Sequence, residues 1–191
     1  MLIKGEVLDS KKSLLAKAIY ILAFTLLLAI LAQIRIPLPF TPVPLTLQTL
    51  GILFIGYYLG ARAGVASVLI YLTLGAMGLP FFSGLKGGVF ILSGPTGGYL
   101  LGFLAGAYLI GKAKEMGWLS NWFYGLSLGL MAHFVIYLFG VTWFLAGFND
   151  QAFFAATKNI LMLTVIPFLP VDLLKSAIFG VFILSQKKAR G

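Results

Sequence analysis

Two residues of opposite charge, Asp172 and Lys175, stand within an otherwise apolar stretch near the C-terminus. Because they are three positions apart, a helix places them on one face. An ionisable side chain inside a membrane-spanning helix costs about 2.5–3.5 kcal/mol on the insertion scale, and such residues usually serve a function. Pro167 and Pro170 should loosen the helix there and free backbone carbonyl groups. We therefore expect a ligand-binding site at this pair; the alternative is a buried ion pair that only holds helices together.

Other residues that could do chemistry are few. His133 is the only histidine, and a single histidine needs carboxylates nearby to hold a metal ion, so we expect it to make a hydrogen bond in the core. The run Gly106–Ala113 resembles a phosphate-binding loop, but it lacks the Ser or Thr that holds Mg²⁺. The chain has no cysteine, which excludes disulfides and thiolate catalysis. We expect no enzyme, no metal site and no cofactor, so any uphill transport must take its energy from a partner or an ion gradient.

The composition is typical of a protein embedded in lipid. Of the 191 residues, 60% are hydrophobic and 10% are charged, and the mean hydropathy is +1.02. A soluble domain carries about 25% charged residues, so most of this surface must face a lipid bilayer. The net charge of +9 comes from basic residues that lie mainly between apolar runs. This distribution indicates orientation in a membrane, and we expect no nucleic-acid partner.

Proline, glycine and charged residues divide the chain into six apolar segments. We expect an all-α integral membrane bundle of six transmembrane helices, forming a single domain over residues 1–191. The second to fourth segments are shorter than the roughly 20 residues of a perpendicular span, which burial against longer neighbours can accommodate. Segments two and three could instead form one long helix, but Gly60, Arg62 and Gly64 favour a tight turn. The predicted segments are Leu14–Ile34, Leu45–Leu59, Ala63–Leu79, Gly98–Ile110, Leu119–Phe144 and Ile160–Leu184.

Basic residues are distributed unevenly between the two sides of this bundle. One side receives only Arg35, Lys86 and Lys158, whereas Lys175 lies within a span. The positive-inside rule places the more basic side in the cytoplasm. Both termini, with the N-terminal segment 1–13 and the basic tail 185–191, should therefore be cytoplasmic. The basic residues on that side are Lys4, Lys11, Lys12, Lys17, Arg62, Lys112, Lys114, Lys187, Lys188 and Arg190.

Two loops on the opposite side have features of a cap over a site. The first contains four prolines between Pro37 and Pro44, which keep the backbone extended at low entropic cost; a plain rigid connector is the alternative. The second, Gly78–Tyr99, is rich in glycine, which permits close approach of the backbone to a ligand. Its apolar interior, Val89–Leu92, suggests that this loop folds onto the protein.

Several of these motifs together resemble the BioY family, the biotin-binding S components of energy-coupling factor (ECF) transporters. The resemblance implies a vitamin uptake protein of the bacterial cell membrane that captures biotin on the extracytoplasmic side. It also implies an ECF transmembrane scaffold subunit and two ABC-type ATPase subunits as partners, which drive inward delivery with ATP. The motifs are Pro39–Gln48, Gly78–Gly88, Gly94–Tyr99, Tyr137–Trp143 and Pro170–Lys175.

For biotin, the resemblance implies that different candidate residues bind different parts of the vitamin. Asp172 would accept a hydrogen bond from a ureido N–H and Lys175 would donate to the ureido oxygen, both through charge-assisted bonds. Lys86 would bind the valerate carboxylate. Gln48 and Tyr99 are secondary polar candidates, although either could only tie loops to helices. The apolar part of biotin would be enclosed by Phe40, Val43, Phe81 and Phe82.

Three other functions remain compatible with the residues. The chain could be an S component for another vitamin, such as riboflavin or thiamine. It could be a self-sufficient homo-oligomeric carrier, which would transport without ATP. A small intramembrane enzyme acting on a lipid-like substrate is a third possibility, but it predicts clustered carboxylates or histidines, and only Asp172 lies in a span.

Overall fold

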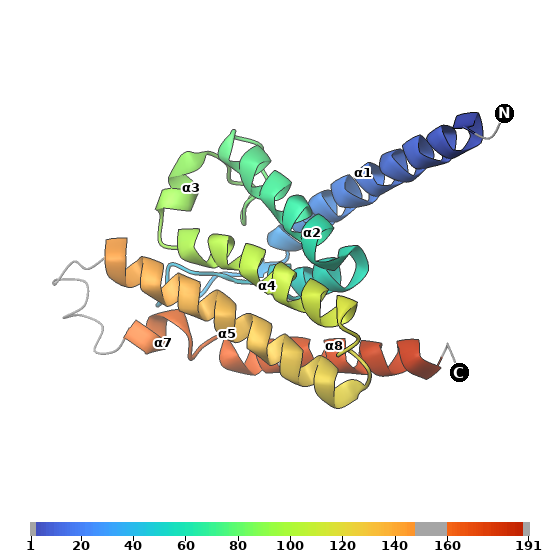
Figure 1. The fold of residues 1–191 in the computed structure, drawn as a ribbon. Coiled ribbons are helices and arrows are strands. Elements are labelled where there is room, and N and C mark those ends of the chain that lie inside the picture. Colours follow the sequence, from blue (N-terminus) through green and yellow to red (C-terminus); the bar gives the residue numbers. More distant parts are fainter. Residues whose placement is uncertain (1–2, 148–159, 189–191) are drawn as a thin grey trace.

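The computed structural model describes residues 3–147 and 160–188, which fold mainly into helices (Figure 1). The predicted helical class is thus confirmed, with one short antiparallel strand pair as an addition. The elements are α1 (Ile3–Gln33), β1 (Arg35–Ile36), β2 (Leu45–Thr46), α2 (Gln48–Ala76), α3 (Val89–Ser93), α4 (Gly97–Glu115), α5 (Trp122–Gly147), α7 (Ile160–Thr164) and α8 (Leu169–Lys188).

Helix α2 reverses direction at Gly60, where φ is +77° and ψ is −179°. The side-chain nitrogen of Gln48 donates to the hydroxyl of Tyr71 at 2.7 Å, although the two residues are 23 positions apart. A continuous helix would separate them by about 35 Å at 1.5 Å per residue. The first arm (48–59) and the second arm (61–76) therefore run side by side in opposite directions, and the predicted break is confirmed.

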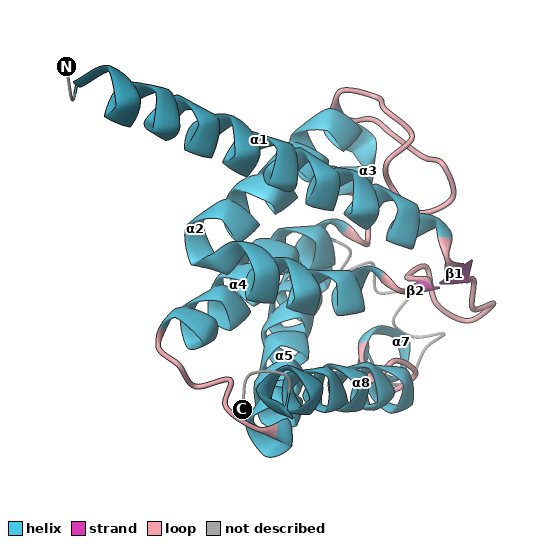
Figure 2. Cartoon of the chain, turned by 90° about the vertical axis from the view of Figure 1, so that its right-hand side faces the viewer, coloured by secondary structure: helices cyan, strands magenta, loops and turns pink. Residues whose placement is uncertain are grey.

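Four helical stretches are long and apolar enough to cross a membrane by length and composition. They include α2 as a whole, whereas α4, with 19 residues, lies packed between α2 and α5. Figures 1 and 2 show the N-terminal half of α1 extending beyond the other helices. From Leu14 to Ile30 many apolar side chains of α1 are exposed, as a helix in contact with lipid requires. The four stretches are Leu14–Gln33, Gln48–Ala76, Trp122–Gly147 and Leu169–Lys187.

The prediction of one continuous sixth segment, Ile160–Leu184, is wrong. Helix α7 ends at Thr164 and α8 begins at Leu169. Pro167 lies in the intervening turn, and it has no N–H with which to continue the helix. Pro170 is tolerated because it falls in the first turn of α8, where backbone N–H groups have no partner within the helix.

The helices pack in sequence, α1 on α2, α2 on α4, α4 on α5 and α5 on α8. Glycine permits the closest of these contacts. A Cβ at Gly56 would lie 2.7 Å from the carbonyl oxygen of Ala107, and one at Gly125 would lie 2.8 Å from the Cα of Gly180. In lipid there is no hydrophobic driving force between helices, so van der Waals contact between the backbones stabilises their packing instead. These contacts fix the relative positions of the helices that carry the site.

Candidate functional site

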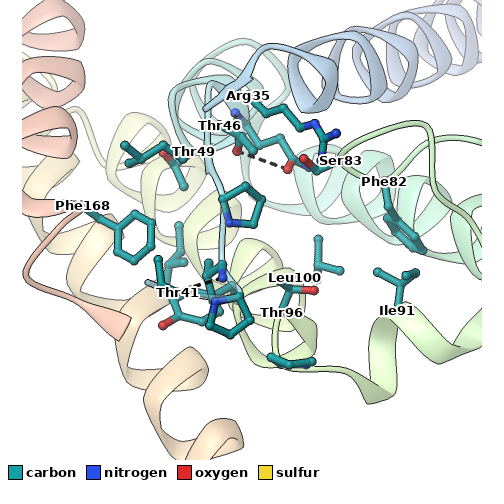
Figure 3. A pocket seen from close by; sticks show the side chains of 18 of the residues that line it. Arg35, Thr41, Thr46, Thr49, Phe82, Ser83, Ile91, Thr96, Leu100 and Phe168 are labelled. Atoms are coloured by element: carbon teal, nitrogen blue, oxygen red, sulfur yellow. Dashed lines mark hydrogen bonds between the residues drawn. The ribbon is translucent and has the colours of Figure 1, made fainter. Parts of the chain in front are cut away.

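A cavity of about 330 Å³ opens where the loop between α1 and α2 meets α3 and the helices α4, α5 and α8. This size is within the range of sites for small molecules. Figure 3 shows its walls, with Thr49 and Phe168 on one side and Phe82 and Ile91 on the other. Of the 27 residues that line the cavity, 12 carry polar or charged side chains, so the hydrogen bonds these already make decide which of them a ligand can use.

The ammonium group of Lys175 is fully bonded within the cavity. Lys175 is 3% exposed and Asp172 is 4% exposed. The lysine Nζ donates to Asp172 Oδ1 at 2.6 Å, to the carbonyl oxygen of Thr46 at 2.8 Å and to Thr49 Oγ1 at 2.9 Å. An ammonium group has three N–H donors, so each has a partner. Lys175 must therefore give up one of these bonds in order to bind a ligand.

Asp172 retains acceptor capacity beyond its bond with Lys175. Thr49 Oγ1 donates to Asp172 Oδ1 at 3.2 Å, and the phenol of Tyr137 donates to Oδ2 in a short hydrogen bond. A carboxylate has about four lone-pair sites. Three of them are used by these residues, which leaves one for a donor on a ligand.

The start of α8 positions this charged pair. The Asp172 N–H donates to the Phe168 carbonyl at 2.9 Å and so opens the helix. Asp172 lies in its first turn, where the helix dipole favours a negative charge. Leu173 and Leu174 are exposed to the outside, whereas Lys175 is buried one turn after Asp172. The helical period therefore turns the carboxylate and the ammonium group to the same inner face.

Gln48 and Tyr99 line the cavity, but their polar atoms already have protein partners. Gln48 donates to the Tyr71 hydroxyl, which in turn donates to the Phe81 carbonyl at 3.2 Å. The Tyr99 hydroxyl donates to the Thr164 carbonyl at 2.7 Å. Gln48 thus ties the two arms of α2 together and Tyr99 ties α4 to α7, and a role of either in ligand binding stays a prediction.

Two cations, Arg35 and Lys86, line the exposed part of the cavity. The backbone of Lys86 pairs with that of Phe82 at 2.9 and 3.2 Å, which closes a tight turn. The guanidinium of Arg35 lies beside this turn, because a Cβ at Gly84 would be 2.6 Å from Arg35 Nη1. Ser83 Oγ, in the same turn, is buried without a hydrogen-bond partner among residues 3–147 and 160–188. The mouth therefore offers positive charge and one unused hydroxyl.

The structure brings most of the predicted residues together but leaves two aside. Phe40 is 55% exposed and lies outside the lining. Phe81 also lies outside it and stacks on Tyr71 with ring centroids 6.1 Å apart. The predicted residues that line the cavity are Val43, Gln48, Phe82, Lys86, Tyr99, Asp172 and Lys175.

Several residues of the site were not predicted from the sequence. Thr49 and Tyr137 bond the charged pair, and Arg35 joins Lys86 at the mouth. Tyr137 is the first residue of one of the motifs quoted above, and Thr49 directly follows another. Their position in or beside these motifs was the available signal.

Comparisons with known proteins agree on one family. The BioY family model matches residues 6–191. The chain is 38% identical to a biotin transporter BioY of Thermotoga maritima, over 86% of this chain and 92% of the relative. It is 35% identical to a probable biotin transporter BioY of Pyrococcus horikoshii, over 85% and 91%. The crystal structure of an S component for biotin from an ECF-type ABC transporter superposes with a TM-score of 0.74 and 28% identity, covering 93% of each chain.

Proposed function

Because this chain belongs to the BioY family, we propose that it takes up biotin as the substrate-binding S component of an ECF transporter. It is a membrane protein and a transport component, not an enzyme. The observation that carries this function is the buried Asp172–Lys175 pair, which lines the cavity. Asp172 offers a ligand one free acceptor site, and Lys175 can exchange one of its protein hydrogen bonds for a bond to the ligand.

Biotin matches this pair through its ureido ring, which has two N–H donors and one carbonyl acceptor. A ureido N–H would donate to the one unoccupied acceptor site of the Asp172 carboxylate, and the ureido oxygen would accept a hydrogen bond from one N–H of Lys175. Both bonds involve a charged group and lie in a buried region, where they are stronger than between neutral groups in water. Thr49 and Tyr137 would hold the carboxylate in place during this exchange.

The rest of the cavity suits the remaining parts of biotin. Phe82, Phe103 and Ile136 provide apolar surface for the thioether ring and the methylene chain, whose burial is favourable by about 25 cal/mol per Å². Arg35 and Lys86 lie towards the exposed side, where the valerate carboxylate would reach. In this pose the urea is innermost and the carboxylate is at the mouth.

The same proposal includes six membrane crossings with both termini in the cytoplasm. The two arms of α2 would each cross once, because they run in opposite directions on either side of Gly60. Together with α1, α4, α5 and α8 this makes six. The loops that border the cavity would then be extracytoplasmic, and the basic residues Arg62, Lys112 and Lys114 would be cytoplasmic. Lys158 and Arg190, which also entered the orientation argument, lie outside the described residues.

We further propose that transport requires an ECF scaffold subunit and two ABC-type ATPase subunits. The likeness to an S component from an ECF-type ABC transporter, over 93% of each chain, supports this proposal. ATP hydrolysed by these partners would then supply the energy. The alternative of a self-sufficient carrier predicts uptake by this chain alone.

The test of ligand identity is calorimetric titration of the purified chain in detergent. We expect one biotin to bind per chain, and riboflavin and thiamine to give no heat of binding. Vesicles that contain the chain alone should show no net uptake, and addition of the scaffold and ATPase subunits with ATP should start it. Binding of riboflavin without biotin, or ATP-independent uptake by the chain alone, would replace this function with one of the alternatives.

Neutralising both cations at the mouth should weaken binding of biotin but not of biotin amide, which has no carboxylate. An exposed ion pair contributes about 0.2–1 kcal/mol, so the variant with Arg35→Gln and Lys86→Gln should lose about tenfold in affinity for biotin, at 1.4 kcal/mol per factor of ten. Its affinity for the amide should change less than about twofold. The single variants then show which cation contributes more. Equal losses for acid and amide would refute a carboxylate site at the mouth.

A further inference from the structure

His133 lies directly behind Asp172, on the side away from the cavity. It is 2% exposed, and its Nε2 is 3.5 Å from Asp172 Oδ1. This nitrogen has no hydrogen-bond partner in the part of the chain that the structure describes. Buried polar atoms almost always have a partner, so an exception calls for an explanation.

The other ring nitrogen fixes the tautomer of His133. Nδ1 is 2.8 Å from the carbonyl oxygen of Gly129, which can only accept a hydrogen bond, so Nδ1 must carry the proton. Ser176 Oγ lies 3.1 Å from the same nitrogen. In a neutral imidazole Nε2 is then unprotonated and presents its lone pair to the Asp172 carboxylate. Any second proton can enter only at Nε2, where it would point at Asp172.

Close packing of α5 against α8 creates this arrangement. A Cβ at Gly129 would lie 3.3 Å from the Cα of Ser176, and the contact between Gly125 and Gly180 is closer still. Such an approach lets a side chain of α5 reach behind an acid on α8. The histidine is therefore held by the backbone, and its distance from Asp172 does not depend on a flexible loop.

Few charged groups of the described residues 3–147 and 160–188 face His133. Asp172 and Lys175 of α8 act on it directly, and Tyr137, one turn further along α5, is bonded to Asp172. From α4, the ring of Tyr99 lies beside Gly140, two turns away, and its hydroxyl is bonded to Thr164. The charged residues of α2 and α4 lie next to the Gly60 kink and in the last turn of α4, and α7 carries none. Protonation of His133 would therefore act mainly on Asp172.

We propose that His133 is a positioning residue that determines whether Asp172 is available to the ligand, an inference that rests on the proposed function. With Nε2 unprotonated, Asp172 keeps its remaining acceptor site for a ureido N–H. When Nε2 takes a proton from water, the imidazolium points at Oδ1, which Lys175 and Thr49 already bond. Its positive charge then makes the whole carboxylate a weaker acceptor, so the site left on Oδ2 binds a ureido N–H less strongly. Proton uptake at His133 and ligand binding at Asp172 thus compete.

The competition predicts weaker binding at acid pH. We expect the affinity for biotin amide, which has no titrating carboxylate, to fall about tenfold from about pH 7.5 to the acid side of the His133 titration. In His133→Gln, which cannot take up the proton, the fall should be less than about twofold. A wild-type profile without pH dependence would overturn the inference, and so would a His133→Gln profile with the same fall as wild type, because a group other than His133 would then cause the pH dependence.

A second measurement keeps the test independent of whether the variant folds. Because the chain has a single histidine, isotope labelling of histidine in a protein without a histidine tag gives NMR signals from His133 alone. At the midpoint of the His133 titration in the ligand-free protein, addition of biotin amide should convert the protonated fraction of the imidazole to the Nδ1–H tautomer. An unchanged protonation state would refute the competition. Absence of biotin binding already at pH 7.5 would instead refute the proposed function, so the two failures are distinguishable.

Discussion

Asp172→Asn should reduce biotin affinity by more than about a hundredfold. The amide keeps the shape of the carboxylate but loses its charge, and each hydrogen bond to a charged group contributes about 1.5–3 kcal/mol. Two such bonds, one from the ligand and one that orients Lys175, are weakened together, and 1.4 kcal/mol corresponds to a factor of ten. Calorimetric titration with biotin measures the loss. Full affinity in this variant would exclude Asp172 from the site.

A matched series separates ligand binding from a purely structural ion pair. Lys175→Met leaves a buried carboxylate without its counter-charge, which should destabilise the protein by about 3–5 kcal/mol. Combining it with Asp172→Asn removes both charges, so thermal stability should recover towards wild type. Biotin binding should not recover, because neither charged partner is present. Recovery of binding together with stability would show that the two charges only hold helices together.

Gly56→Ala should strongly destabilise the fold, whereas Gly64→Ala should not. The added methyl at Gly56 would meet the Ala107 carbonyl oxygen at 2.7 Å and Ile110 Cβ at 2.8 Å, neither of which can move without shifting α4. Overpacking of this kind costs about 1–3 kcal/mol, which corresponds to a decrease in melting temperature of about 2–12 °C for a chain of this size. Thermal unfolding in detergent, followed by fluorescence and size-exclusion chromatography, provides the measurement.

Gly64 is the control for this change because it lies on the second arm of the same helix. A methyl there would meet its nearest neighbours at 3.5–3.6 Å, which is ordinary contact, and alanine favours a helix over glycine by about 0.8–1.0 kcal/mol. We expect an unchanged or slightly higher melting temperature. If Gly56→Ala were equally well tolerated, the backbones of α2 and α4 would be further apart than the structure has them.

The helical class, the reversal at Gly60 and the charged pair could all be predicted from the sequence. Each depends on a local rule. A long apolar run predicts a membrane helix, two glycines flanking an arginine within five residues predict a turn, and an ionisable residue in lipid requires a partner. Asp172 and Lys175 are partners within one helix, so no knowledge of the tertiary arrangement was needed to pair them.

The missed residues depend on how separate helices are aligned. Thr49 bonds Asp172 from 123 positions away and Tyr137 from 35, and nothing in the local pattern near either residue specifies this. Phe40 and Phe81 show the same limit in the loops, where side-chain direction follows no helical or strand period. The division between α7 and α8 was indicated by Pro167 and Pro170, but apolar residues continue through the turn and concealed it.

The complete bonding of Lys175 bears on how the protein rejects other molecules. Thr46, Thr49 and Asp172 already satisfy this ammonium group, so an incoming molecule gains only the difference between the contacts it makes and those it interrupts. A compound with the outline of biotin but with a ring that lacks N–H and carbonyl groups would break hydrogen bonds of Lys175 without forming new ones. Buried polar groups left without a partner carry a large free-energy penalty. Discrimination against such analogues thus depends on the hydrogen bonds that the protein already makes to Lys175, and not on the shape of the cavity.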